Sequence, residues 1–425
     1  MSPALDIETA LATVRTSLAT KLSPLPKDDV DLVEIGLLDS MGWVDVLIVI
    51  ESVIGIRDFG NPWPENRAKS ICVLAEMILE AQKPSPEEKP CASVGGQPVS
   101  EREIAVGGWG YILGSQEVDA AQIERDLALP LHKIREGAGI HSVRLAADTE
   151  DEVDLGQRAA EIALEMAEIQ IEDIDVVVAT SSTFLGFPSF AASLHAQMLL
   201  RETSPALDVG GACVGFIYSL SVAKSLLCTS SQAAALVVAS EVHSRRLRAP
   251  QVPGEFRGLF GDGACAVVLT NKGRVAGDGK VRLRDFVWGC SGTFASSLGA
   301  RMSENGELGI EFKGEQLAHA AVTQLDRIIG TLEKLSAKPR SEVDYFALHQ
   351  PNPRVVEILG EKAKIPLEKI PLVSRTCGNL GSVTCGVSLC QALTNVRAGG
   401  DQSRTPLILM AAVAPGLTWG GGFLN

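Results

Sequence analysis

The sequence predicts a small all-α segment followed by a larger α/β segment. Three observations support this division: a linker-like stretch, helical periodicity ahead of it, and buried-strand runs that alternate with helices after it. Residues 82–102 are rich in Pro, Ser, Gly and Glu and have no apolar period, which is typical of a linker. The chain of 425 residues is thereby divided into residues 1–81 and residues 103–425.

The first segment is predicted to be helical. Apolar residues recur near its start at the three- and four-residue spacing of a helix: Ile7, Ala10, Leu11, Val14 and Leu18. A second helix is predicted to begin near Ser40, with Asp39 or Ser40 as its N-cap, and a third to span residues 70–81. Three amphipathic helices in about 80 residues predict a small bundle.

The second segment alternates between strands and helices. Uninterrupted apolar runs, typical of strands buried on both faces, occupy residues 174–180, 235–240, 265–270 and 407–414. Helical stretches between them cover residues 153–169, 215–230 and 315–335. This order predicts an α/β fold with parallel or mixed sheets. It also fits a weak two-fold duplication, with halves at residues 103–275 and 276–425.

Composition excludes several classes of protein. Hydrophobic residues make up 46% of the chain and charged residues 21%, as in packed globular proteins. No apolar run reaches the roughly 18 residues that span a bilayer, and the N-terminus is acidic where a signal peptide is basic. A net charge of −14 argues against nucleic acid as a partner. Nine cysteines without metal-ligand spacing predict a cytoplasmic protein with no metal site.

The acidic charge is concentrated in the first segment. Residues 1–81 hold 13 Asp and Glu against 6 Lys and Arg, so 13 − 6 gives 7 of the 14 excess negative charges. An acidic small domain favours a basic docking partner. A merely soluble surface explains the same charge equally well.

Cys213 is the candidate nucleophile. In DVGGACVGFIYSL an extended stretch is followed by glycines, the cysteine and an amphipathic helix. A helix N-terminus favours the thiolate form, which is the nucleophile. The flanking glycines leave room for a tight turn and a close substrate. Taken alone, the pattern fits a buried structural cysteine equally well.

His349 and Asn379 complete a candidate constellation. His349 ends the apolar strand run YFAL, and Asn379 lies in a Gly-Asn-Leu-Gly turn before a helix of small residues. Singly, each has a structural explanation, as a strand-end histidine and as a turn residue. Together with Cys213 they form a Cys-His-Asn set suited to nucleophilic catalysis.

Ordered motifs now give a specific resemblance. Residues 103–425 resemble β-ketoacyl-ACP synthase III, a condensing enzyme of the thiolase fold. The motifs that carry this resemblance are AGIHSVR (138–144), SSTFLGFPS (181–189), ACVGF (212–216), LFGDGACAVVL (259–269), HQPN (349–352), GNLGSVT (378–384) and the closing loop GLTWG (416–420). The resemblance implies two duplicated βαβ halves in a five-layer αβαβα fold and a homodimer.

The resemblance also implies a reaction. Cys213 would receive an acyl group as a thioester, from acyl-CoA or acyl-ACP. His349 and Asn379 would bind the thioester carbonyl of a malonyl-type, carrier-bound extender and stabilise the enolate formed on decarboxylation. Claisen attack on the acyl-Cys213 would give a 3-ketoacyl product, with the Cys213 N–H serving the tetrahedral intermediate.

Three further residues take roles from the same resemblance. Phe187 would reach across the dimer and close the partner's acyl pocket. Asn352 and Arg354 would lie near the incoming pantetheine and its carrier.

Two departures from the family's pattern bear on the substrate. Pro415 stands where the family usually has a glycine that donates its N–H to the oxyanion, and proline has no N–H. The local string APGLT (414–418) resembles the closing loop of type III polyketide synthases instead. The tryptophan and threonine linked to coenzyme A binding have no clear match in residues 129–140, which leaves a carrier-bound donor open.

The first segment resembles an acyl carrier protein. EIGLLDSMGWVDVLIVIE (34–51) is similar to the carrier signature, and Ser40 matches the serine to which a phosphopantetheinyl transferase attaches 4′-phosphopantetheine. This implies a four-helix carrier bundle. The alternative is that Ser40 is only an N-cap. Trp43, Val44 and Ile48 replace acids that are usual on this helix, which indicates a docking surface specialised for its own synthase.

Three functions remain open. The first is decarboxylating condensation in fatty-acid or polyketide-type biosynthesis, with the fused carrier delivering donor or extender in cis. The second is acyl transfer from Cys213 to an oxygen or nitrogen, which forms an ester or amide without loss of CO2. The third is a non-catalytic carrier and scaffold.

Overall fold

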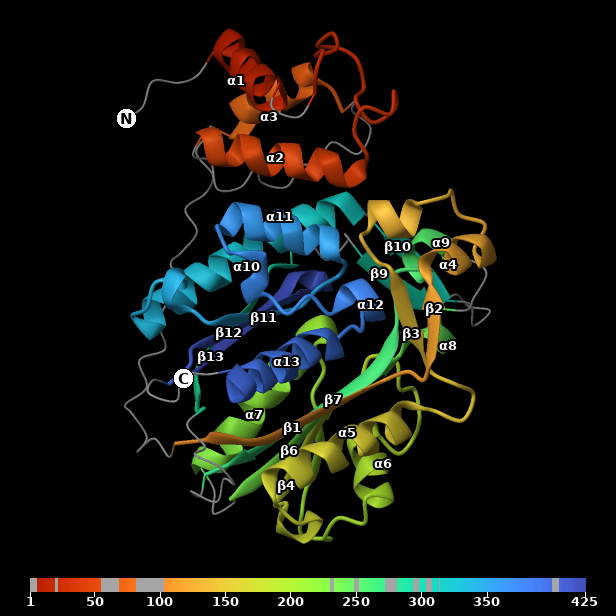
Figure 1. Cartoon of the computed structure of the whole chain (residues 1–425), viewed down its shortest axis with the longest axis vertical. Coiled ribbons are helices and arrows are strands. Elements are labelled where there is room, and N and C mark those ends of the chain that lie inside the picture. The colour runs from red at the N-terminus through yellow and green to blue at the C-terminus, as the bar shows by residue number, and fades with distance from the viewer. Residues whose placement is uncertain are drawn as a thin grey trace.

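The described part of the first segment is helical in the computed structural model (Figure 1). The structure describes residues 6–19, 22–54, 69–81, 103–229, 233–247, 252–271, 281–292, 298–302, 308–312, 314–399 and 405–425. The helices are α1 (Ile7–Ala19), α2 (Ser40–Ile54) and α3 (Ile71–Ala81). They share a buried core that includes Val14, Leu47 and Leu74. All three predicted helices are confirmed. The four-helix bundle stays a prediction, because residues 55–68 lie outside the described residues.

The first sheet of the second segment has five strands and is mixed. In spatial order they are β1 (Ala105–Leu113), β7 (Asp262–Thr270), β6 (Ala234–Val242), β4 (Val176–Thr180) and β5 (Ala206–Asp208). β4 pairs in parallel with β5 and β6, whereas β7 is antiparallel to β6 and β1. β4, β6 and β7 are buried along their whole length, as their uninterrupted apolar runs predict.

The second sheet repeats this topology with four strands. Their order is β11 (Tyr345–Leu348), β12 (Ile408–Ala414), β13 (Thr418–Leu424) and β8 (Leu283–Cys290). β11 and β12 are parallel, and β13 is antiparallel to both of its neighbours. The sequence β4-β6-β7-β1 in the first sheet has the same pattern of directions. A two-fold duplication gives such a repeat, although the predicted boundary falls among residues 272–280, outside the described residues.

Helices cover both sheets and fill the space between them (Figure 1). The helices are α5 (Glu152–Ala167), α6 (Phe190–Gln197), α7 (Gly215–Thr229), α10 (Gly314–Ser336), α11 (Pro353–Ala363) and α13 (Val383–Gly399). α5 and α6 pack on the outer face of the first sheet, and α7 and α13 lie between the sheets. α10 and α11 cover the outer face of the second sheet, in a core cluster that also contains Val44 and Ile48 of α2. The layers of the second segment are therefore αβαβα.

Short elements connect these layers. They are β2 (Gln116–Asp119), α4 (Ala120–Asp126), η1 (Lys133–Gly137), β3 (Ser142–Leu145), η2 (Ile171–Asp173), η3 (Ala212–Val214), α8 (His243–Arg246), α9 (Gly254–Arg257), β9 (Leu298–Met302), β10 (Leu308–Phe312), η5 (Arg340–Glu342), η6 (Leu367–Lys369), α12 (Ser374–Cys377) and η7 (Pro415–Leu417). β2 pairs with β3 and β9 with β10, both antiparallel. Residues 416–420, expected as a closing loop, enter strand β13 at Thr418.

One stretch has the length and apolar composition of a membrane span. It covers Ala212–Thr229 and is half buried. It consists of η3 and α7, and α7 is the helix packed between the two sheets. Core helices of soluble proteins commonly pass the same test, so this stretch is explained by its place in the middle layer.

Candidate active site

Cys213 lies at the start of the central layer. It belongs to the short turn η3, which leads directly into α7 and packs against β12 and the start of α13. Val214 N–H donates to the Gly211 carbonyl at 3.0 Å and closes the turn. The Cys213 side chain is partly buried against the central core and keeps some exposure. A thiol in this place is accessible from one side only.

His349 is delivered by the edge strand of the second sheet. It follows β11 directly, and its N–H donates to the Ala411 carbonyl of β12 at 2.9 Å, which continues the parallel ladder by one residue. The side chain is 3% exposed. Its Nδ1 is buried and has no hydrogen-bond partner among the described residues. A ring nitrogen that the protein leaves unpartnered is available to a substrate.

Asn379 is held by a rigid turn between α12 and α13. Its N–H donates to the Leu259 carbonyl at 2.8 Å, and its carbonyl accepts from Gly261 N–H at 3.0 Å. Its side-chain Oδ1 accepts the N–H of Gly381 at 2.9 Å. The turn therefore occupies the oxygen of the amide and leaves its Nδ2 group as a donor.

Glu241 reaches the same turn from the first half of the fold. This residue of β6 is fully buried. Its Oε2 accepts the N–H groups of Ser182 at 2.9 Å and Thr183 at 3.0 Å, and its Oε1 accepts the hydroxyl of Ser382 at 2.6 Å. The carboxylate also acts electrostatically on Cys213. The turn after Asn379 and the nucleophile are thus joined through one buried acid.

His243 borders the turn from the other side. Its Nδ1 hydrogen-bonds the Gly261 carbonyl at 3.1 Å, and its ring packs on Phe260 with centroids 4.7 Å apart. The imidazole lies against Gly381 and lowers the pKa of His349 by its proximity. His349 and Asn379 therefore meet at one turn, Asn379 to Ser382, and Glu241 links that turn to Cys213 electrostatically.

Glu241 and His243 are not predicted from the sequence. Neither belongs to one of the motifs described above, and their side chains reach the site only through the tertiary fold. SEVH (240–243) does place an acid and a histidine directly after an uninterrupted apolar strand. That combination is the signal that could have identified them.

Burial sets the charge state of the nucleophile. Burial, together with the nearby Glu241 carboxylate, raises the pKa of Cys213 to about 12. The prediction that a helix N-terminus would favour the thiolate is therefore wrong for the free enzyme. The dipole of a short turn is outweighed by desolvation and by a like charge. The resting group at neutral pH is the thiol.

Burial has the opposite effect on the histidine. Burial and the nearby His243 lower the pKa of His349 to about 4. A hydrogen bond with the Gly381 backbone acts in the opposite direction but is outweighed. His349 is consequently a neutral imidazole at physiological pH. A neutral ring can accept a proton at one nitrogen and donate a hydrogen bond from the other.

Pro415 begins the turn that closes the site. It opens η7, and its carbonyl accepts the hydroxyl of Thr418 at 3.3 Å. The turn is tied to β8 by two hydrogen bonds of 2.9 Å between the backbones of Ser291 and Leu417. Position 415 itself offers no N–H.

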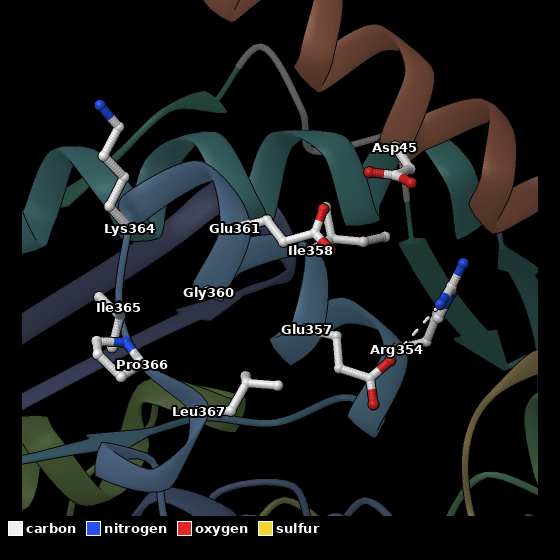
Figure 2. A pocket seen from close by; sticks show the side chains of 10 residues that line it. All are labelled: Asp45, Arg354, Glu357, Ile358, Gly360, Glu361, Lys364, Ile365, Pro366 and Leu367. Carbon is white, nitrogen blue, oxygen red and sulfur yellow. Dashed lines mark ion pairs between the residues drawn. The ribbon is translucent and has the colours of Figure 1, made fainter. Parts of the chain in front are cut away.

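The other predicted residues lie on the loop before α6 and at the start of α11. Phe187 is fully exposed on the loop between β4 and α6, beside the exposed Leu185. Asn352 is the N-cap of α11, where its Oδ1 accepts Val355 N–H at 2.9 Å. Arg354 begins α11 and pairs with Glu357 at 3.6 Å, as Figure 2 shows.

Ser40 begins α2, and its side chain lies outside what the structure describes. Asp39 caps this helix: its carboxylate accepts the Gly42 N–H at 2.6 Å, and its carbonyl accepts the N–H of Trp43 at 3.0 Å. The helix thus has a cap that does not depend on the serine.

No metal chemistry is indicated where the structure can be read. Within the described ranges, no group of three or more His, Cys, Asp or Glu side chains could hold a metal ion. The cluster around Asn379 instead offers a thiol, a neutral imidazole and an amide donor. These are the groups needed for acyl transfer through a thioester and for stabilising an enolate.

Known proteins match the second segment. A family model described as FAE1/Type III polyketide synthase-like protein matches residues 133–349, and one for the C-terminal part of 3-oxoacyl-ACP synthase III matches residues 334–425. The β-ketoacyl-(acyl-carrier-protein) synthase III 1 of Vibrio vulnificus (strain YJ016) is 30% identical over 322 residues. That match covers 75% of this chain and 98% of the relative.

Two further comparisons agree. The synthase III of Shewanella oneidensis is 32% identical over 296 residues, which cover 69% of this chain and 90% of the relative. The crystal structure of 3-oxoacyl-(acyl-carrier-protein) synthase III from Aquifex aeolicus VF5 superposes with a TM-score of 0.65 at 28% identity, over 76% of this chain and 99% of that one. The chain therefore belongs to the β-ketoacyl-ACP synthase III family and is a condensing enzyme of the acyltransferase class.

Proposed function

We propose that the chain joins an acyl group on Cys213 to a malonyl-type extender by decarboxylating Claisen condensation, in fatty-acid or polyketide biosynthesis. The observation that supports this proposal is the turn from Asn379 to Ser382, which holds the Asn379 amide, contacts a neutral His349 through Gly381 and is bonded to Glu241, a carboxylate that acts on Cys213. Two hydrogen-bond donors beside a nucleophilic thiol suit a reaction that first makes an enolate and then uses it.

The first half-reaction loads the nucleophile. The Cys213 sulfur attacks the carbonyl of an acyl thioester, and the C–S bond to the donor's thiol breaks. Because the resting group is a thiol, its proton must leave as the new bond forms. The neutral His349 accepts that proton and returns it to the departing thiol, which leaves acyl-Cys213 and no net change in charge.

The second half-reaction extends the chain. His349 and Asn379 hydrogen-bond the thioester oxygen of the malonyl group, and breaking of the C–C bond releases CO2 and places the electron pair on an enolate. The two donors stabilise that charge. The enolate carbon then attacks acyl-Cys213, and the Cys213 sulfur departs and regains a proton. The product is a 3-ketoacyl thioester longer by two carbons.

The presence of both donors favours condensation over the alternatives. Simple transfer of an acyl group to an oxygen or nitrogen needs the cysteine and a base, and leaves Asn379 without a task. A non-catalytic scaffold needs none of the three. The rigid support of Asn379, by three hydrogen bonds of 2.8 to 3.0 Å, supports the enolate-forming reaction.

We further propose that residues 1–81 are a carrier domain and residues 82–102 its linker, ahead of the halves 103–275 and 276–425. A phosphopantetheinyl transferase would attach 4′-phosphopantetheine to Ser40, and the arm would supply a terminal thiol for a donor or extender. The cap that Asp39 provides supports this, since it frees Ser40 from that duty. A linker of about 20 residues keeps the carrier at an effective concentration of order millimolar.

The remaining assignments complete the proposal. We assign Asn352 and Arg354, at the start of α11, to the path of the incoming pantetheine. Leu185 and Phe187 are exposed apolar side chains on one loop, which supports a homodimer in which Phe187 closes the partner's acyl pocket. Cys265, Cys377, Cys385 and Cys390 are buried thiols that form no disulfide, which supports a reducing, cytoplasmic setting.

The test is a measurement of intact-protein mass combined with product analysis. The protein is treated with a phosphopantetheinyl transferase and then with a panel of acyl thioesters, in wild-type form and as Ser40→Ala and Cys213→Ala. We expect an arm that Ser40→Ala abolishes, an acyl group that Cys213→Ala abolishes, and CO2 release in step with a product longer by two carbons.

Other outcomes separate the alternatives. An acyl group that leaves Cys213 for an alcohol or amine without CO2 would make the chain an acyltransferase. Turnover that survives Cys213→Ala would overturn the nucleophile. Wild-type protein that never gains an arm would remove the carrier assignment and leave a condensing enzyme that uses free substrates.

A further inference from the structure

Helix α2 is buried on two sides. One set of its side chains belongs to the core of the small domain: Trp43, Val46, Leu47 and Ile50. Val44 and Ile48 instead join the core cluster of α10 and α11. A helix that is apolar all round is one covered on all sides. Of the three apolar residues that replace the usual acids on this helix, Val44 and Ile48 thus have a specific partner, the outer helix layer of the synthase, whereas Trp43 packs within the small domain.

Glu51 continues the face that Val44 and Ile48 turn to the synthase. The spacing of four and then three residues keeps all three side chains on one side of α2. Glu51 is 2% exposed. Its Oε1 hydrogen-bonds His319 Nε2 of α10 at 2.9 Å, and its Oε2 accepts Lys362 Nζ of α11 at 2.8 Å. One buried carboxylate therefore joins the small domain to two helices of the synthase.

The charges at this contact are complementary in both directions. Lys362 also donates to Thr323 Oγ1 of α10 at 2.9 Å. At a second point, Lys69 of the small domain pairs with Glu315 at the start of α10. An acid on α2 thus meets bases on the synthase, and a base of the small domain meets an acid. The contact therefore selects its partner by the sign of the charges as well as by shape.

The balance at Glu51 favours the ionised acid. Burial raises the pKa of the Glu51 carboxyl, but the hydrogen bonds and charges of His319 and Lys362 outweigh it and hold the pKa below its usual range. A docked helix without an acid at this position would leave His319 and Lys362 buried against no counter-charge, which is costly. When the domains separate, water solvates all three groups. The three groups, Glu51, His319 and Lys362, therefore contribute more to the specificity of docking than to its strength.

The direction of α2 relative to α11 brings the start of α2 toward the predicted pantetheine path. Asp45 lies over the part of α11 that begins with Arg354, whereas Glu51, further along α2, binds Lys362 near the end of α11. The two helices therefore run in the same direction. A pocket of about 560 Å³ is lined by α11, by residues 364–367 and by Asp45 of α2, and Figure 2 shows Asp45 above Arg354, Ile358 and Glu361. From the shared direction of the two helices we infer that the start of α2, at Ser40, is nearer to the end of α11 that Asn352 caps than to the end that holds Lys362.

We infer that Glu51 seats the N-terminal domain on the α10–α11 face of its own synthase, so that this face serves the fused domain in cis and is closed to carrier proteins in trans. The cis and trans roles rest on the proposed carrier function. The seating itself rests only on the contacts of α2. Glu51 is a positioning residue, because it touches neither substrate nor the reacting atoms.

The experiment compares full-length variants by hydrogen–deuterium exchange. Glu51→Lys places a cation against His319 and Lys362, and adding Lys362→Glu restores an acid–base pair. Glu8→Lys makes the same change of charge at an exposed site on α1 and is the matched control. We expect faster exchange over α10 and α11 in Glu51→Lys, wild-type exchange in the double variant and in Glu8→Lys, and no change in α5. Glu51→Gln, which keeps the shape, should give an intermediate result.

A second measurement tests the consequence for access. The KM for an extender on a free carrier protein should fall by about tenfold in Glu51→Lys and return in the double variant, while kcat on a carrier-free thioester stays constant. Unchanged exchange in Glu51→Lys overturns the seating, as does failure of the double variant to restore it. Altered exchange with an unchanged KM for the free carrier overturns the closure. Altered exchange in a protein that gains no arm on Ser40 retains the seating and rejects the carrier function alone.

Discussion

The imidazole of His243 occupies the space into which a side chain at position 381 would project. A Cβ built on Gly381 would lie 2.7 Å from His243 Cε1 and 2.8 Å from its Nε2. Neither partner is free to move, because His243 is bonded to the Gly261 carbonyl and Gly381 donates its N–H to Asn379. Gly381 also has a φ of +58°, which L side chains rarely adopt. The turn that carries Asn379 therefore requires glycine.

Replacing Gly381 by alanine should damage the site more than the fold. The strained φ and the contact with His243 together should cost about 1–3 kcal/mol of unfolding free energy and displace the Asn379 amide. We expect CO2 release from the extender to fall by at least about tenfold, while acylation of Cys213 continues. Gly137→Ala, where a Cβ would meet nothing within 4 Å, is the control. Equal CO2 release in the two variants would contradict this account.

The low pKa of His349 predicts a flat pH profile. Since its pKa is about 4, the ring is neutral from about pH 5 upward. In Cys213→Ala protein, where decarboxylation is seen alone, the rate should not change between about pH 6 and 8. A midpoint near 6.5 would show that His349 titrates as an ordinary histidine and works in its charged form.

The same shift affects stability with a definite sign. The unfolded chain takes up a proton at His349 near pH 6.5, whereas the folded chain does so only near 4. Stability should therefore fall as the pH drops through this window, and His349→Gln should reduce the slope. Urea unfolding at pH 7 and pH 5 measures the difference.

The raised pKa of Cys213 predicts slow and strongly pH-dependent alkylation. With a pKa of about 12, the thiolate fraction is small at neutral pH and grows about tenfold per pH unit. The rate of labelling by iodoacetamide, followed by peptide mass, should rise in this way from pH 7 to 9 without a plateau. Cys290, which is exposed, serves as the internal reference for reagent reactivity. A plateau below pH 8 would indicate a thiolate already stabilised in the free enzyme.

The strands that could be predicted are those whose burial leaves a continuous apolar run. The predicted runs 174–180 and 407–414 agree closely with the bounds of β4 and β12. Both faces of these strands are packed, so their residues form a continuous apolar run. β13 has the sequence TWGGGFL and lacks such an apolar run. The sequence therefore predicts a loop up to residue 420. The glycines of β13 have a packing cause: a Cβ on Gly421 would lie 2.5 Å from Ile328 of α10. A strand that a helix touches directly loses the side chains by which strands are recognised.

The site divides along a similar line. Cys213, His349 and Asn379 each carry a local signal, since each ends a strand or occupies a turn before a helix. Glu241 and His243 act through bonds to segments far away in the chain, which only the fold brings near. The contact of Glu51 with His319 and Lys362 could not be predicted either, because a single acid on an apolar helix does not indicate which residues it will pair with.

Glu150 should make the first half sensitive to acid. Its carboxylate accepts N–H groups from Ala147 at 2.9 Å and Ser115 at 3.1 Å and pairs with Arg158 at 2.7 Å. Burial raises the pKa of this group, but these bonds outweigh it and lower the pKa to about 2. The stabilisation is therefore complete above pH 4.5, the ordinary value, and is lost as the pH falls from there toward 2.

Glu150→Gln should cost about 2 kcal/mol of unfolding free energy at pH 7, because bonds to a charged acceptor are weakened and Arg158 loses its partner. The difference in unfolding free energy between the variant and wild type should become smaller as the pH falls from 5 to 3, because the wild-type protein then loses the same negative charge. Glu172→Gln, at an exposed position, is the matched control. Urea unfolding at four pH values measures both curves. A gap that stays constant down to pH 3 would mean that shape, and not the charge of Glu150, holds the loop before α5.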